Sequence, residues 1–141
     1  MSGETPAEAG PALDALLRVL ASDPAAPVAR STIPRAREVH VADSLSGLEA
    51  PELRAAGTIA DVGAGAGLPG LVLAAVLPAA RVDLVESVSR KCEFIGRAIE
   101  AMRIGNARVI CARAEELGLG PARESYDAVT ARAVGPLAVL A

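Results

Sequence analysis

The sequence predicts an α/β fold built on a parallel β-sheet, and three observations support this prediction. From Gly57 onward, short apolar segments of strand length alternate with longer segments of helical periodicity, which is the pattern of repeated β-α-β units. A glycine-rich turn over residues 63–70 follows the first apolar segment and precedes a helical one. The second predicted strand ends in an acid, Glu86, at the edge where open parallel sheets bind their ligands.

Two helices are expected before the sheet, over residues 12–21 and 38–48, because their valines and leucines recur at helical spacing. The elements expected after them are, in order, a strand at 57–62, a helix at 69–77, a strand at 81–86, a helix at 89–102, strands at 107–111 and 126–130, and a helix from residue 134. Ser89 is the expected N-cap of the helix that it opens. We therefore divide the chain into a helical N-terminal extension, residues 1–56, and a sheet domain, residues 57–141.

No strand is expected after residue 130, so the fourth strand is predicted to form an unprotected edge of the sheet. The N–H and C=O groups along such an edge are free to pair with another chain. Self-association through this edge is therefore a prediction.

The turn between the first strand and its helix has the features of a ligand cradle. Gly63, Gly65 and Gly67 place no Cβ atom between the backbone and a ligand, so N–H groups near a helix N-terminus can approach it. Asp61 ends the preceding strand, and its carboxylate suits a ligand with an ammonium group, such as the methionine part of S-adenosylmethionine. Glu86 is placed to accept two hydrogen bonds from a ribose diol.

A second pattern overlaps the first. Gly65, Gly67 and Gly70 also match G-x-G-x-x-G, and Glu86 lies 19 residues after Gly67, close to the spacing of a dinucleotide-binding unit. This match favours a dinucleotide-dependent oxidoreductase, which stays open as an alternative.

The formal net charge of −3 at pH 7 does not indicate a nucleic-acid-binding protein, but the charge is unevenly distributed. Residues 88–113 contain six Lys and Arg side chains against two Glu side chains. This segment is either a solvated helix face or a surface that contacts phosphate groups. With one Phe and one Tyr in the chain, a platform for stacking bases is not expected.

The sequence predicts neither a metal site nor a membrane segment. Cys92 and Cys111 occur with no second pair and one distant His, which is not a zinc pattern. The longest uncharged run, residues 62–80, reaches the length of a membrane span but contains four glycines and two prolines. Because the N-terminus shows no signal for export, we expect a soluble cytoplasmic protein in which both cysteines are free thiols.

The second expected helix contains His40, Asp43 and Ser44, which are the residue types of a catalytic triad. A catalytic serine requires a base oriented by a third group and an oxyanion hole, and this spacing offers no such hole. Two interpretations stay open for His40, a hydrogen bond on the helix surface and a role in binding the substrate.

Several segments together resemble one family. They are residues 61–70 (DVGAGAGLPG), 85–87 (VES) leading into 90–91 (RK), 113–116 (RAEE), 126–133 (YDAVTARA) and the His-x-x-Asp-Ser pattern at 40–44. They are similar to the GidB family, also called RsmG, the bacterial methyltransferases that modify N7 of a guanine in 16S ribosomal RNA. The resemblance covers about residues 35–141, and Gly-Leu-Pro-Gly at 67–70 is its most specific element.

The resemblance implies a Rossmann-like class I methyltransferase fold that uses S-adenosyl-L-methionine and that is C-terminally incomplete in this chain. It implies that Gly63 and Leu68 contact the cofactor at the turn. It also implies that Ala114 and Glu115 contact the adenine end and that Arg132 closes the site, where a cation can steer an RNA phosphate. The predicted cofactor-binding set is Asp61, Gly63, Gly65, Gly67, Leu68, Glu86, Ala114, Glu115 and Arg132, and the predicted substrate-binding set is His40 and Arg132.

The implied reaction matches the absence of a candidate base. Guanine N7 carries an in-plane lone pair and no proton, so its attack on a sulfonium methyl group needs placement and no general base. We therefore assign no catalytic residue. Because the family's last strands are not expected in this chain, a non-catalytic fragment is the third hypothesis.

Overall fold

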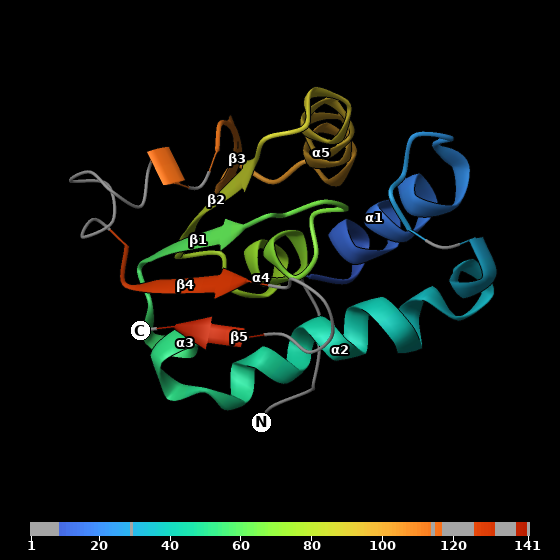
Figure 1. Ribbon diagram of the computed structural model, residues 1–141. Coiled ribbons are helices and arrows are strands. Elements are labelled where there is room, and N and C mark those ends of the chain that lie inside the picture. The colour runs from blue at the N-terminus through green and yellow to red at the C-terminus, as the bar shows by residue number, and fades with distance from the viewer. Residues whose placement is uncertain (1–8, 29, 114, 117–125, 132–137, 141) are drawn as a thin grey trace.

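The computed structural model describes residues 9–28, 30–113, 115–116, 126–131 and 138–140. One β-sheet with the strand order β3-β2-β1-β4-β5 runs through its centre (Figure 1). Its strands are β1 (Thr58–Val62), β2 (Arg81–Glu86), β3 (Ala107–Cys111), β4 (Ala128–Ala131) and β5 (Ala138–Leu140). The first four strands pair in parallel, and with its flanking helices this sheet confirms the predicted α/β, Rossmann-like fold.

The helices match the predicted positions more closely after residue 57 than before it. The α-helices of the described chain are α1 (Gly10–Ser22), α2 (Ala42–Leu45), α3 (Pro51–Ala55), α4 (Gly70–Val76) and α5 (Ser89–Met102). Around α2, residues Arg37–Val41 form a π-helix and Ser46–Glu49 a 3-10 helix, so the single helix predicted over 38–48 is divided. Its apolar face is nevertheless as predicted, since Val41, Leu45 and Leu48 are buried.

The core lies between the sheet and the helices α1, α4 and α5. Phe94, Ile95 and Ala98 form the apolar stripe of α5, and each is fully buried. Helix α1 packs against α4 and α5, and its Leu13 and Leu16 belong to the same hydrophobic cluster. The N-terminal helix therefore shares one core with the sheet, and the proposed domain boundary between residues 56 and 57 stays a prediction.

The last described strand corrects a prediction. The helix expected from residue 134 is wrong for Ala138–Leu140, which form β5 and pair antiparallel with β4, and residues 132–137 lie outside the described part. Figure 1 shows the arrow of β5 pointing opposite to that of β4. The predicted exposed edge of β4 is therefore wrong, and self-association through it loses its basis. A short apolar run does not distinguish a strand from a helix by periodicity alone.

The start of α5 also differs from the prediction. Val88, with extended backbone angles, is the N-cap residue, and no side chain caps the helix. Ser89 is the first helical residue, so it is not the N-cap. The N–H of Val88 instead donates to the Glu86 carboxylate at 3.0 Å, which fixes the chain where it leaves β2.

The side chain of Asn106, just before β3, contacts the carbonyl end of α4 and the segment that leads from it into β2. Its side-chain Nδ2 donates to the backbone oxygens of Ala74 at 2.9 Å, Leu77 at 3.2 Å and Ala80 at 2.9 Å. A helix end leaves its last carbonyls without intrahelical partners. This one side chain therefore satisfies groups that the helix itself does not.

Replacing Asn106 with alanine is expected to lower the free energy of unfolding by about 1–3 kcal/mol, because buried acceptors lose their donor. Urea denaturation of the two proteins measures the difference. Asn106→Asp serves as the matched control, since it keeps the shape but removes the donor, and it is expected to destabilise at least as much. Equal stability of wild type and Asn106→Ala would show that these bonds contribute nothing.

A buried carboxylate on β2 is held by an ion-pair cluster. The Asp83 side chain is fully buried, and it accepts hydrogen bonds from Arg108 Nε at 2.8 Å and from the Tyr126 hydroxyl at 2.7 Å. Arg81 Nη2 lies 3.5 Å from the same carboxylate. Burial alone raises the pKa of Asp83, but these bonds and the charges of Arg108 and Arg81 outweigh it, so its pKa lies below the ordinary value of 3.8.

The lowered pKa of Asp83 makes stability depend on pH in the acid range. The stabilisation is fully present above the unfolded-state pKa of 3.8 and is lost as pH falls through the lower folded-state value. The difference in unfolding free energy between wild type and Asp83→Asn is therefore expected to be about 1–3 kcal/mol at pH 7 and to shrink below pH 3.8. Urea denaturation across this range measures it. A difference that stays constant would contradict the assignment, and Glu93→Gln, an exposed carboxylate on α5, is the control.

Candidate functional site

The glycine turn between β1 and α4 has the backbone that its sequence predicts. Gly63, Gly65 and Gly67 have φ angles of +69°, +55° and +84°, in the left-handed region that residues with a Cβ atom rarely adopt. The backbone therefore favours glycine at all three positions, and at Gly67 a Cβ atom would in addition lie too close to Leu71 Cδ1.

Most of the turn's N–H groups already donate within the protein. Gly63 and Ala64 donate to the backbone oxygen of Val85 at 2.9 and 3.1 Å, and Gly67 donates to that of Ala64 at 2.7 Å. The two bonds to Val85 attach the turn to the end of β2. In the described chain no partner is found for the N–H groups of Ala66 and Leu68. We expected the amides of this turn to face a ligand, and the structure differs because most of them donate to the protein itself.

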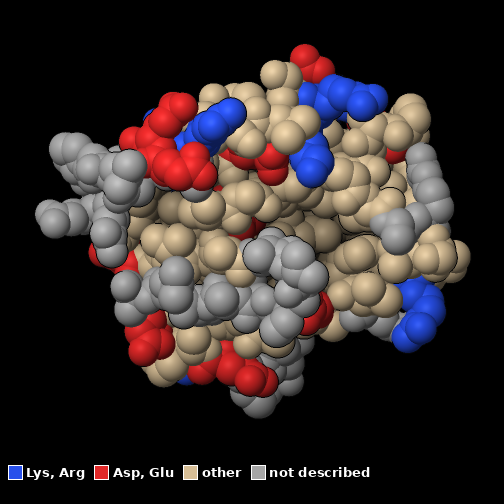
Figure 2. Space-filling model, viewed as in Figure 1, with Lys and Arg blue, Asp and Glu red and all other residues tan. Residues whose placement is uncertain are grey.

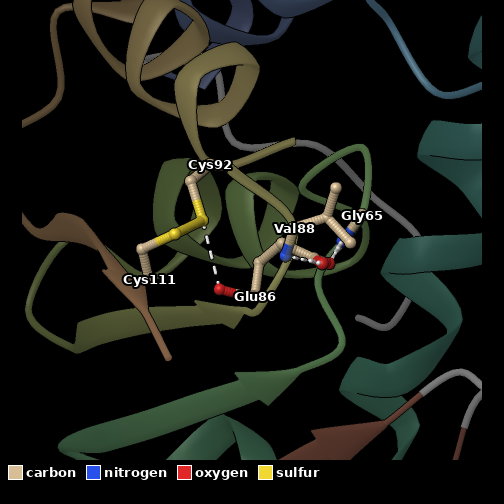
Figure 3. The surroundings of a disulfide bond; sticks show 5 residues. All are labelled: Gly65, Glu86, Val88, Cys92 and Cys111. Atoms are coloured by element: carbon tan, nitrogen blue, oxygen red, sulfur yellow. Dashed lines mark hydrogen bonds between the residues drawn. A yellow bond between two sulfur atoms is a disulfide. The ribbon is translucent and has the colours of Figure 1, made fainter. Parts of the chain in front are cut away.

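Glu86 at the end of β2 faces this turn. Its carboxylate is nearly buried, at 6% residue exposure, and accepts from the N–H of Gly65 at 2.8 Å with Oε1 and from the N–H of Val88 at 3.0 Å with Oε2. Figure 3 shows Gly65 and Val88 converging on this carboxylate. Each carboxylate oxygen has a second lone-pair direction, so Glu86 can hold the turn and still accept a further hydrogen bond.

Asp61 connects the turn to two other elements. It is 1% exposed, and its Oδ2 accepts from the N–H of Gly70 at 2.8 Å, while its Oδ1 accepts from the Thr130 hydroxyl at 3.0 Å. A Cβ atom at Gly70 would lie 2.7 Å from Asp61 Oδ2 and 2.8 Å from Leu84 Cδ2. The fourth glycine thus allows α4 to approach β1 closely.

A cavity of about 350 Å³ opens at the carboxyl ends of β1, β2 and β3. This is the edge at which open α/β sheets bind ligands, and the volume falls in the range of about 300–1,000 Å³ common for small-molecule sites. Three predicted site residues line it, namely Gly63, Glu86 and Glu115. Sequence reasoning missed the other lining residues, which are Val62, Val85, Ser87, Ala112 and Arg113.

The missed residues adjoin predicted ones, which is the signal that could have found them. Ser87 follows Glu86, and Ala112 and Arg113 follow β3, at ends of strands that had been assigned. The structure does not place Asp61, Gly65, Gly67 or Leu68 among the residues that line the cavity. Ala114 and Arg132 lie outside the described residues.

His40 is partly exposed, and its Nε2 lies 2.9 Å from the Thr32 hydroxyl. The Ser44 hydroxyl donates to the backbone oxygen of His40 at 2.7 Å, so the two residues do meet, but through the backbone. His40 is not among the residues that line the cavity, and its role in binding the substrate stays a prediction.

The basic segment 88–113 is partly neutralised. Arg97 Nε lies 2.8 Å from Asp23 and Arg108 Nε 2.8 Å from Asp83. Figure 2 shows Lys and Arg side chains over α5 and β3 with Asp and Glu side chains among them. The two interpretations of this segment, a solvated face and a phosphate-contacting surface, stay open.

The cysteines beside the cavity are not the free thiols that we expected. Cys92 and Cys111 form a disulfide, with their Cα atoms 5.9 Å apart, within the usual range for such a bond. Cys92 lies in the first turn of α5 and Cys111 ends β3 (Figure 3). Elsewhere, the described residues contain no group of three or more His, Cys, Asp or Glu side chains arranged to hold a metal.

Comparison with known protein families gives a match for this chain. Residues 28–141 match the family model described as GidB, rRNA small subunit methyltransferase G. The chain belongs to the GidB family. The matched region takes in every strand of the sheet, the glycine turn and all the residues that line the cavity.

Individual GidB relatives agree with this assignment. Ribosomal RNA small subunit methyltransferase G of Rubrobacter xylanophilus is 50% identical over 103 residues, which are 72% of this chain and 40% of the relative. The protein of the same name from Sorangium cellulosum is 45% identical over 104 residues, 73% of this chain and 44% of the relative. The chain therefore spans less than half the length of these curated relatives.

Among solved structures, a protein-L-isoaspartate O-methyltransferase superimposes on this GidB chain with a TM-score of 0.43 and 23% identity, over 52% of this chain and 22% of its own. A likeness of this size bears on neither the fold nor the function.

Proposed function

We propose that this chain is an S-adenosylmethionine-dependent methyltransferase that transfers a methyl group to N7 of a guanine in 16S ribosomal RNA. The observation that carries the proposal is the cavity at the ends of three parallel strands, with the Glu86 carboxylate on its wall and facing the glycine turn. Membership of the GidB family supports the choice of reaction and substrate.

The residues present fit a sulfonium nucleoside. Glu86 and Glu115 line the cavity with one cation, Arg113, and carboxylates on a cavity wall favour a ligand that carries positive charge. In the proposal, Glu86 accepts the ribose hydroxyls through its remaining lone pairs. Gly63 provides a wall without a side chain, and Glu115 lies at the adenine end.

The other predicted site residues have supporting roles in this proposal. Asp61, Gly65 and Gly67 shape the turn that borders the cofactor, and the N–H of Leu68 is available to it. Ala114 and Arg132 are proposed to complete the adenine end and the side next to β4, and His40 is proposed to contact the RNA.

The bound cofactor supplies an electrophilic methyl group on a positively charged sulfur. The protein's task is to hold this methyl group in line with the N7 lone pair and to keep water from the reacting atoms. In this proposal Glu86, Gly63 and Glu115 would hold the cofactor, and Arg132 and His40 would hold the RNA beside it. No proton is transferred, so the site requires no general base.

The substrate implies where the protein acts. We propose the cytoplasm, because ribosomal RNA of the small subunit is the proposed partner. Within the described residues, the helices are all too short or too polar to cross a bilayer. No metal takes part in the proposed reaction.

Calorimetry with S-adenosylhomocysteine and with NAD tests the proposal. We expect heat of binding with S-adenosylhomocysteine alone, followed in a separate assay by transfer of a labelled methyl group to guanine N7 of small ribosomal subunits. Binding of NAD alone would favour a dinucleotide-dependent oxidoreductase. Binding of S-adenosylhomocysteine without methyl transfer would identify a non-catalytic fragment.

A further inference from the structure

The disulfide between Cys92 and Cys111 lies directly beside the proposed cofactor site. In the sheet register Cys111 is paired with Glu86, and the next residue, Ala112, donates its N–H to the backbone oxygen of Glu86 at 3.0 Å. The Cys92 sulfur lies 3.1 Å from the same oxygen. Figure 3 shows the disulfide on one side of Glu86, and Gly65 and Val88 on the other.

The disulfide attaches a wall of the cavity to a helix. Ala112 and Arg113, which line the cavity, immediately follow Cys111. Cys92 is in the first turn of α5, whose Phe94 and Ile95 are fully buried in the core. The cross-link therefore holds an exposed strand end against a fixed element.

The two cysteines differ in accessibility in a way that allows exchange. Cys111 is exposed at the surface, whereas Cys92 is 8% exposed. Access to a sulfur and the stability of the released thiolate govern thiol–disulfide exchange. A thiolate released at Cys92 lies in the N-terminal turn of a helix, where negative charge is favoured.

We infer that Cys92 and Cys111 form a reversible thiol–disulfide site that controls the order of the cavity wall at Ala112 and Arg113, and thereby the affinity for the cofactor. The effect on affinity rests on the function proposed above, whereas the effect on the wall does not. The bond forms again when a small-molecule disulfide, such as oxidised glutathione, accepts two electrons: one cysteine thiolate attacks it and releases a thiolate, and the second cysteine thiolate then displaces the other half.

Reduction by a dithiol proceeds in two exchanges. One thiolate of the reductant attacks Cys111 Sγ, which forms a mixed disulfide and releases the Cys92 sulfur as a thiolate. The second thiolate of the reductant then attacks the reductant's own sulfur in the mixed disulfide, which breaks the bond to Cys111, releases the Cys111 thiolate and converts the reductant to a cyclic disulfide. Two electrons pass from the reductant to the cysteines, and the two protons of the dithiol reach the cysteine sulfurs through solvent.

The reduced form is the weaker binder in this scheme. Without the cross-link, residues after Cys111 keep the hydrogen bond from Ala112 to Glu86 but lose their covalent attachment to α5. The cofactor must then order this wall as it binds, and the loss of conformational entropy lowers the affinity of the protein for the cofactor. Couplings of this kind change an affinity by about fivefold or more.

The test compares the oxidised chain with the chain reduced by dithiothreitol, each checked by the mass gained on alkylation of free thiols. Hydrogen exchange at the Ala112 amide is expected to become faster on reduction, and the affinity for S-adenosylhomocysteine to fall by about fivefold or more. Cys111→Ser is expected to behave like the reduced chain with or without dithiothreitol. Cys92→Ser, at the other end of the bond, is expected to do the same.

The outcomes separate the inference from the proposed function. Equal exchange at Ala112 in the two redox states overturns the inference, whatever binds. Faster exchange together with no binding of S-adenosylhomocysteine in either state supports the control of the wall and overturns the proposed function. Faster exchange with equal affinity in both states overturns the link to the cofactor.

Discussion

Glu86→Ala is expected to weaken binding of S-adenosylhomocysteine by about 30- to 150-fold, which corresponds to about 2–3 kcal/mol for the loss of hydrogen bonds to a charged group. The substitution removes the proposed acceptor of the ribose hydroxyls. It also leaves the N–H groups of Gly65 and Val88 without the carboxylate that they contact at 2.8 and 3.0 Å, so the turn loses its attachment to the end of β2.

Calorimetry measures this effect, and two further variants sharpen it. Glu86→Gln keeps an acceptor for one N–H but loses the charge, so its affinity is expected to fall between those of wild type and Glu86→Ala. Glu93→Ala removes an exposed carboxylate of α5 and is expected to bind as wild type does. Undiminished binding by Glu86→Ala would exclude Glu86 from the cofactor site.

Gly70→Ala and Gly96→Ala are expected to change stability in opposite directions, although the chemical change is the same. At Gly70 the new Cβ atom would lie 2.7 Å from Asp61 Oδ2 and 2.8 Å from Leu84 Cδ2, which forces a shift in a packed region at a cost of about 1–3 kcal/mol. At Gly96, inside α5, no atom lies within 4 Å of the new Cβ, and replacing a helical glycine gains about 0.5–1 kcal/mol.

Thermal unfolding of the two variants beside wild type measures both effects. Because Gly70 also donates to Asp61, the destabilised variant is expected to bind S-adenosylhomocysteine more weakly as well. A Gly70→Ala protein as stable as wild type would show that α4 does not pack against β1 as closely as described.

The elements from Gly57 to Cys111 could be predicted from the sequence because their local signals agree. The strand predicted at 81–86 coincides with β2, the strand at 107–111 with β3 and the helix at 89–102 with α5. In each case an apolar run of strand length or an amphipathic repeat is bounded by turn residues. The glycine turn was predicted because glycines at alternate positions lie between a strand and a helix, and the structure gives three of them positive φ angles, which glycine adopts most readily.

The features that were missed depend on contacts between distant segments. The pairing of Cys92 with Cys111 arises because the first turn of α5 and the end of β3 meet at one edge of the sheet. The strand β5 forms because β4 offers an edge to pair with. Neither partner is a neighbour in sequence, so periodicity carries no signal of it.

The sequence predicted where the candidate site lies but only some of the residues that line it. Gly63, Glu86 and Glu115 were assigned because strand ends of a parallel sheet converge. That Glu86 accepts from Gly65 and Val88 could not be predicted, because it depends on how the turn folds back over the end of β2.

The contacts of Asp61 make the glycine turn and the end of β4 mechanically dependent on each other. Its carboxylate is bonded at once to the first residue of α4 and to Thr130 on β4, in a buried position with no solvent to replace either partner. A ligand that displaces the turn must therefore also move Thr130 or break a buried bond. The cofactor side and the β4 side of the sheet edge are in this way linked through one carboxylate.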